Sequence, residues 1–118
     1  MLIKFDNLKD LLIFNIKYYR YVNKFLQEKL AELCKLSPRY ISYIESGLHC
    51  PTILKIESIA KALSIEPYIL FQNPPRDKKI INKMNTSRQY NQKRRLKNEN
   101  HSSSLFFIYQ WFFKVNTT

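Results

Sequence analysis

Gly47 is the only glycine in a chain of 118 residues. β-Sandwiches, small barrels and phosphate-binding loops use glycine in tight turns, because other residues reach those backbone angles only at a cost. A chain with one glycine is therefore poorly suited to these architectures. Hydrophobic residues make up 45% of the sequence, which is too many for a chain that is disordered throughout. An all-α fold is the class that remains.

Apolar residues in the first 73 positions recur at helical spacing. A first helix is expected from residue 8 to about residue 22, with Asp6 and Asn7 as candidate caps. Its apolar stripe consists of residues that recur every three or four positions: Leu8, Leu12, Ile16 and Tyr19. A second helix of about two turns is expected over residues 27–34.

Three further helices are marked by residues that begin or end helices. Ser37 offers an N-cap hydroxyl, and Pro38 follows at the first helical position, where its missing N–H costs nothing. Gly47 stands where the end of a helix favours a left-handed residue, so the third helix is expected to end there. Pro51–Thr52 opens a fourth helix, and Glu66–Pro67 opens a short fifth.

The distribution of charge divides the chain at residue 73. Residues 1–73 carry ten basic and seven acidic side chains, whereas residues 74–118 carry ten basic and two acidic ones. We expect a folded domain over residues 8–73. Residues 74–104 are polar and basic without sustained apolar periodicity, which predicts a mostly disordered linker. Residues 105–118 form a short aromatic tail to which the sequence assigns no role.

The sequence predicts no metal, cofactor or catalytic site. Cys34 and Cys50 lack C-x-x-C spacing, and His49 and His101 are not spaced as zinc ligands. No nucleophile–base pair, carboxylate pair or cofactor loop is visible, so we expect neither an enzyme nor a small-molecule ligand. Two thiols without a signal peptide favour a cytoplasmic location. No apolar run approaches the roughly 20 residues of a membrane span.

A helix-turn-helix spacing runs through the second and third expected helices. With Gln27 as position one, a small residue stands fifth and apolar residues stand tenth, fifteenth and eighteenth: Ala31, Leu36, Ile41 and Ile44. Two short helices that cross at about 90–120° need a small side chain at the crossing and apolar residues that lock it. Ala31 and Ile41 fit these two requirements.

On these residues the chain resembles the Xre/Cro-type, lambda-repressor-like family of helix-turn-helix regulators. The resemblance covers about residues 12–71, with five segments in order: NIKYYR, QEKLAEL, SPRYISYIESG, PTILKIESIAKAL and EPYILF. It implies a compact five-helix domain that binds double-stranded DNA as a homodimer, with the third helix in the major groove. A net charge of +11 is consistent with attraction to a polyanion.

The resemblance also implies roles for individual side chains. Base contacts would come from four residues of the third helix: Pro38, Arg39, Tyr40 and Tyr43. Phosphate contacts would come from Gln27 and Ser42. Outside the resemblance, the loop residue His49 is a further candidate for a phosphate contact, and a loop residue without a role is the alternative. Arg39 is able to donate two hydrogen bonds to guanine. For Tyr40 and Tyr43, packing on the helix surface is an equally open interpretation.

Several positions depart from the usual pattern of this family. Lys24 and Lys35 stand where the family often has glycine, and Leu26 stands where it often has a Ser or Thr cap. Lys35 must adopt or avoid a left-handed backbone, at a cost of roughly 1 kcal/mol. Leu48 and His49 follow the glycine in place of a basic residue, and the basic tail is a candidate to replace that phosphate contact.

The resemblance further places an ion pair between Arg20 and Glu45, which would tie the first helix to the end of the third. The function that all of these features predict is sequence-specific DNA binding by a small, repressor-like transcriptional regulator. Two alternatives stay open. One is a protein-interaction module that uses the same helices, and the other is a membrane-surface adaptor that uses the aromatic tail.

Overall fold

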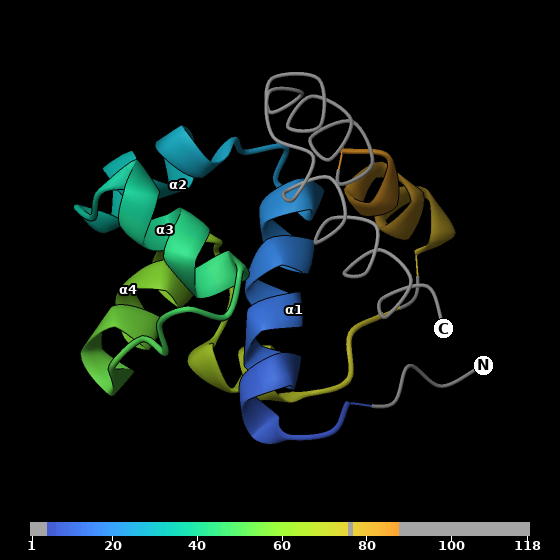
Figure 1. Cartoon of the computed structure of the whole chain (residues 1–118), viewed down its shortest axis with the longest axis horizontal. Helices are drawn as coiled ribbons and strands as arrows, with labels where there is room; N and C mark the ends of the chain where they lie inside the picture. The colour runs from blue at the N-terminus through green and yellow to red at the C-terminus, as the bar shows by residue number, and fades with distance from the viewer. Residues whose placement is uncertain (1–4, 76, 88–118) are drawn as a thin grey trace, which may run out of the picture. The chain divides into compact units, whose positions relative to one another are not determined.

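Five helices follow one another between residues 8 and 71 (Figure 1). The protein is described by a computed structural model, which covers residues 5–75 and 77–87. The helices are α1 (Leu8–Val22), α2 (Gln27–Cys34), α3 (Pro38–Glu45), α4 (Ile53–Ala62) and the 3-10 helix η1 (Pro67–Phe71). The described residues include no strand. The prediction of an all-α, five-helix domain is confirmed.

Side chains cap the start of three of the helices α1 to α4. The side-chain oxygens of Asn7, Ser37 and Thr52 each accept the backbone N–H of the residue three positions later, at 2.9, 3.1 and 3.4 Å. Each bond satisfies one of the N–H groups that the start of a helix leaves without a partner. Leu26 offers no such oxygen, so α2 begins without a side-chain cap.

The hydrophobic core lies where the five helices meet. Its fully buried apolar side chains come from every helix: Ile16 in α1, Leu30 and Ala31 in α2, Ile41 and Ile44 in α3, Ile59 in α4 and Leu70 in η1. Each fully buried Leu or Ile contributes about 1.5–3 kcal/mol. Contacts between helices, more than the propensity of any single short helix, therefore hold the domain together.

Within residues 5–75 and 77–87, three residues other than glycine adopt a left-handed backbone: Lys24 (φ 58°), Lys35 (φ 59°) and Ser64 (φ 60°). Lys35 forms the C-cap of α2, so it adopts this conformation rather than avoiding it. The conformation brings the N–H of Leu36 to 2.9 Å from the carbonyl oxygen of Ala31, which closes the end of α2. The turn between α2 and α3 is therefore formed at the expense of local strain.

A buried asparagine fixes η1 to α1. Asn15 is 0% exposed, and its Nδ2 donates to the carbonyl oxygens of Leu70 and Gln72, both at 2.7 Å. Its Oδ1 has no hydrogen-bond partner among the described residues. Asn15 thus supplies hydrogen bonds to two carbonyl groups at the point where the chain leaves η1. A buried carbonyl group without a hydrogen bond would lower the stability of the fold.

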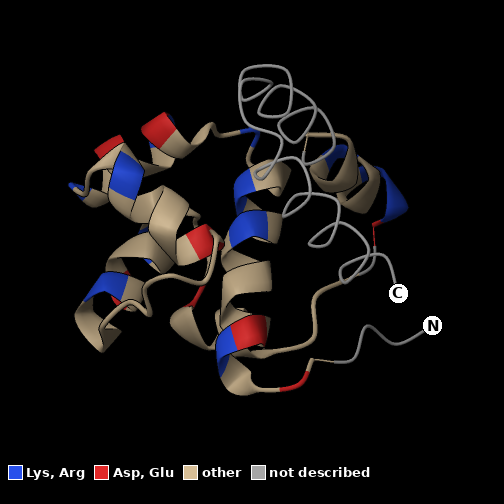
Figure 2. Ribbon diagram, viewed as in Figure 1, with Lys and Arg blue, Asp and Glu red and all other residues tan. Residues whose placement is uncertain are grey.

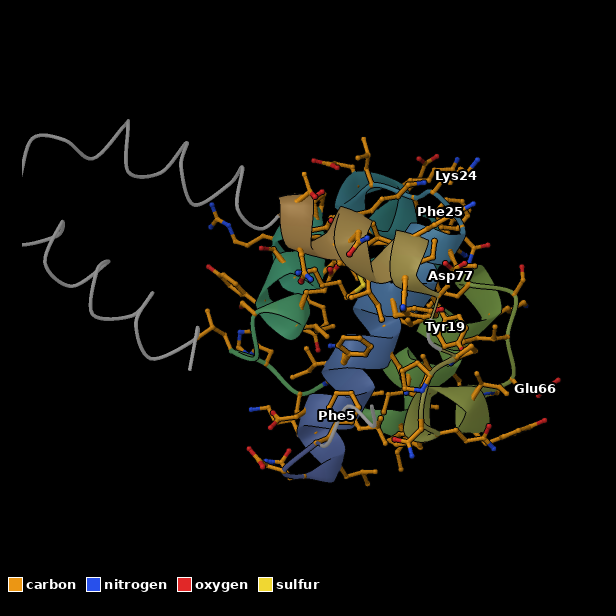
Figure 3. All side chains as sticks on the ribbon, turned by 90° about the vertical axis from the view of Figure 1, so that its right-hand side faces the viewer. Phe5, Tyr19, Lys24, Phe25, Glu66 and Asp77 are labelled. Atoms are coloured by element: carbon orange, nitrogen blue, oxygen red, sulfur yellow. The ribbon has the colours of Figure 1, made fainter. Side chains whose placement is uncertain are left out.

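Residues 78–87 form a helix, within the segment 74–104 for which the sequence predicted a mostly disordered linker, so the prediction is corrected for these ten residues alone. Asp77 stands directly before this helix, and its Oδ1 accepts the N–H of Lys79 in the first turn at 2.9 Å. The N–H of Asp77 donates to the hydroxyl of Tyr18 in α1 at 3.4 Å, and Met84 is only 6% exposed. The segment up to Met84 belongs to one compact unit with the five helices, on the side of α1 away from α3 and α4 (Figure 1 and Figure 3).

The sequence did not predict this helix because its apolar residues are few. Ile80, Ile81 and Met84 are spaced as on one helix face, but they stand among lysines and polar residues. A short helix of this composition is marginal in water and depends on packing against other elements. The rest of the predicted linker, residues 88–104, and the aromatic tail, residues 105–118, lie outside the described residues.

Candidate nucleic-acid interface

The third helix buries one side and exposes the other. Ile41 and Ile44 are 0% exposed, and successive residues of an α-helix are turned by about 100°. Arg39 and Tyr43 therefore lie on the outer face of α3, where Arg39 is exposed and Tyr43 is half-buried. Among the described residues, the guanidinium of Arg39 has neither an ion-pair nor a hydrogen-bond partner. The outer face of α3 thus carries an uncompensated cation.

The other predicted contact residues lie on or next to α3. Pro38 is exposed in its first turn, and Ser42 is half-buried one turn later. Gln27 is the first residue of α2, whose initial N–H groups have no side-chain cap. His49 is exposed in the loop between α3 and α4.

An aromatic cluster flanks α3 on the side of that loop. The ring centroids of Tyr40 and His49 are 5.8 Å apart with their planes inclined by 20°, and those of Tyr43 and His49 are 5.3 Å apart at 50°. The Nζ of Lys55, in the first turn of α4, lies 4.3 Å from the centroid of the Tyr40 ring. Sequence reasoning missed Lys55, because it belongs to a different helix and no motif links it to Tyr40.

Arg20 and Glu45 form an ion pair between α1 and the end of α3. The Nη2 of Arg20 lies 2.8 Å from Glu45 Oε1, and its Nε lies 2.9 Å from Oε2. The Nη1 donates to the carbonyl oxygen of Phe25 at 2.9 Å, and the guanidinium stacks 4.7 Å from the ring of Tyr21. The two side chains are 7% and 3% exposed. Glu45 is therefore neutralised and removed from the outer face of α3.

Basic and acidic side chains are mixed on most helices (Figure 2). On α2, for example, Lys29 lies 3.9 Å from Glu32 in a solvent-exposed pair. The helix α3 differs, because Arg39 and Glu45 are its only charged residues and only Arg39 faces solvent. The electrostatic character of the outer face of α3 is therefore positive.

The two cysteines lie in different environments. Cys34 is 8% exposed, and burial raises the pKa of its thiol to about 11. It therefore stays protonated near neutral pH and packs as a small core residue. Cys50 is exposed in the loop before α4. Within the described part of the chain, no cluster of His, Cys, Asp and Glu is arranged to hold a metal ion, and no helix is long and apolar enough to cross a membrane.

Two short packed helices joined by a tight turn define a helix-turn-helix motif, and the second of them, α3, has an exposed, positively charged face. The family model Helix-turn-helix (HTH_3) matches residues 16–70. A crystal structure of the hypothetical transcription factor NHTF from Neisseria is similar, with a TM-score of 0.58 and 30% sequence identity, over 63% of this chain and 85% of that one. The comparison with curated proteins gave no match.

The chain therefore belongs to the Xre/Cro-like helix-turn-helix family, as the sequence resemblance predicted. It is a helix-turn-helix regulator of the DNA-binding type.

Proposed function

We propose that the protein binds a specific sequence of double-stranded DNA as a small, repressor-like transcriptional regulator, with α3 in the major groove. The outer face of α3 carries the proposal. Arg39 is exposed there without a partner among the described residues, while Arg20 neutralises Glu45. An unpaired carboxylate at this face would repel the phosphate backbone, whereas an unpaired guanidinium attracts it and reads guanine.

Individual contacts follow from the position of each residue. Base contacts are assigned to Pro38, Arg39 and Tyr43, because they lie on the outer face of α3 or in its first turn. Phosphate contacts are assigned to residues at the edges of this surface: Gln27, Ser42 and His49. Tyr40, predicted from the sequence as a base contact, is assigned a different role, since its ring already contacts His49 and Lys55.

The proposal includes a homodimer on DNA. Two copies of α3 would enter successive major grooves on one side of the duplex, at half-sites about 34–36 Å apart. A palindromic consensus in the sequences that the protein selects is the expected result. A single half-site bound by one copy of the chain would contradict this part of the proposal.

The test is selection from a randomised duplex pool, followed by sequencing, with Arg39→Ala, Arg39→Lys and the control Lys61→Ala on α4. Arg39→Ala should lose at least tenfold in affinity for the preferred site, since a bidentate contact with guanine is worth about 1–3 kcal/mol and 1.4 kcal/mol is a factor of ten. Its melting temperature should stay unchanged. Arg39→Lys should recover affinity without the full preference, because lysine lacks the planar fork. Equal enrichment by Arg39→Ala and the parent would exclude α3 as the reader.

A protein-interaction module is the second candidate, and exposed apolar side chains favour it. Leu48, Ile53 and Leu54 are 69%, 75% and 75% exposed around the start of α4. Large apolar side chains that gather at a surface often mark a protein contact. A partner bound there would show an affinity that depends weakly on salt, whereas DNA binding falls steeply with salt. The membrane-surface alternative depends on residues 105–118, which lie outside the described part of the chain.

A further inference from the structure

Lys55 is held on an aromatic ring at the edge of α3. Its Nζ lies 4.3 Å from the centroid of the Tyr40 ring, which is a favourable cation–π geometry. Among the described residues it forms no ion pair with a carboxylate. The ring itself is half-buried and packs against the hydrophobic core. Tyr40 therefore fixes the position of the Lys55 ammonium without neutralising its charge.

The position of Lys55 in its own helix is electrostatically unfavourable. It is the third residue of α4, whose N-terminal turn contains no acidic residue. The start of a helix carries a partial positive charge, so a cation there is disfavoured and an anion is favoured. His49 lies against the same tyrosine. The first turn of α4 and the Lys55 ammonium thus concentrate positive potential, and among the described residues no carboxylate pairs with Lys55.

This positive site adjoins the outer face of α3. Tyr40 follows Arg39 in α3 and is turned by about 100° from it, toward the α3–α4 loop. Glu45 leaves the opposite flank of α3, toward Arg20 in α1. Lys55 therefore borders the proposed base-reading face on one side, at the place where a DNA backbone would pass if α3 entered the major groove.

We propose that Lys55 binds a DNA phosphate and that Tyr40 is the residue that positions it, not a residue that reads a base. The role of Tyr40 and the role of Lys55 each have a physical cause. A ring that is packed on the core and covered by His49 and Lys55 has little surface left for a base. A lysine held on a ring loses less conformational freedom when it binds a phosphate. The inference rests on the proposed DNA binding by α3.

The experiment measures the affinity of the full chain for its selected duplex over a series of KCl concentrations. Lys55→Gln should weaken binding to every duplex by a similar factor and lower the slope of log K against log [salt] by about 0.9, the value for one phosphate contact. Tyr40→Leu should have the same effect, and the double variant should lose no more than either single one. Tyr40→Phe should rescue affinity and slope, because phenylalanine keeps the ring.

The matched control is Lys61→Gln, which also removes a lysine from α4 but at the opposite end of the helix. It should leave the salt slope unchanged. Melting temperatures identify any loss of folding in Tyr40→Leu. Lys55→Gln and Tyr40→Phe both keep the aromatic ring packed on the core, so they test the proposal even if Tyr40→Leu does not fold. A slope for Lys55→Gln equal to that of Lys61→Gln would overturn the phosphate contact. Altered sequence preference in Tyr40→Phe would make the hydroxyl a reader. Absence of DNA binding by the parent would instead overturn the proposed function, and the inference with it.

Discussion

The guanidinium of Arg20 in α1 grips the carboxylate of Glu45, the last residue of α3, at 2.8 and 2.9 Å. The pair is almost fully buried, and Arg20 also binds the carbonyl oxygen of Phe25 in the turn before α2. One side chain thus joins the first helix, the α1–α2 turn and the end of the proposed recognition helix. The contact therefore adds a polar connection to the apolar packing of Ile41 and Ile44, which also holds α3 on the domain.

Removal of one partner of this pair should be strongly destabilising. Glu45→Ala leaves the Arg20 guanidinium buried without its counter-ion, and loss of one partner of a buried pair costs about 3–5 kcal/mol. Urea denaturation measures this loss as a lower free energy of unfolding. Glu32→Ala is the control, because its pair with Lys29 is exposed and 3.9 Å long, and it should change stability by less than about 0.5 kcal/mol. Equal effects of the two variants would show that the Arg20–Glu45 pair adds nothing.

The left-handed conformation of Lys35 predicts a stabilising substitution. Glycine adopts φ near 59° without the steric cost that a lysine bears, so Lys35→Gly should raise the free energy of unfolding by up to about 1 kcal/mol. Glycine also gains freedom in the unfolded chain, which reduces the benefit. The same substitution at Lys29, within α2, should instead destabilise by about 1 kcal/mol. Thermal melts of the two variants should therefore shift in opposite directions.

The burial of Met84 predicts that the folded domain extends past residue 73. Met84→Ala should lower the free energy of unfolding by at least about 2 kcal/mol, in the range of other buried methionines. Lys83→Ala, at an exposed neighbouring position, should have little effect. A chain that ends at residue 73 should also melt at a lower temperature than one that ends at residue 87. Identical melting of both truncated chains would return the domain boundary to residue 73.

Cys34 predicts a loss of stability at alkaline pH. Burial raises the pKa of its thiol from 9.0 to about 11, so the unfolded chain releases the proton at lower pH than the folded one. The stabilising contribution is therefore complete below pH 9 and is lost as the pH rises toward 11. Tyrosines and lysines titrate in the same range, so the measured quantity is the difference in unfolding free energy between the parent and Cys34→Ala. The unfolding free energy of the parent minus that of Cys34→Ala should decrease as the pH rises from 9 to 11.

The same burial predicts selective alkylation. At pH 8 a thiol reagent should modify Cys50, which is exposed, and leave Cys34 unmodified in the folded protein. Mass spectrometry should find one adduct, and two after denaturation. Two adducts at equal rates in the native protein would show that Cys34 is accessible.

Local sequence determined where the helices begin and end. Ser37 and Thr52 cap helices by bonds to residues only three positions away, and Gly47 ends α3 through its own backbone angle. Because such interactions involve neighbours along the chain, they can be recognised without the fold. The helical spacing of apolar residues likewise placed Ile41 and Ile44 in the core and Arg39 on the outside of α3. The helix-turn-helix domain and the outer face of α3 follow from these features.

Tertiary structure decided which polar residues gained a partner. From its polar side chain, Asn15 would be expected on the surface of α1. It is buried instead, and its amide donates hydrogen bonds to two carbonyl groups at the end of η1. Lys55 meets Tyr40, and Tyr18 meets Asp77, only because the core brings their helices together. Contacts between residues far apart in sequence depend on how all helices pack at once. No spacing rule within a single helix contains that information, and the side chain that most changes the candidate interface, Lys55, belongs to this second group.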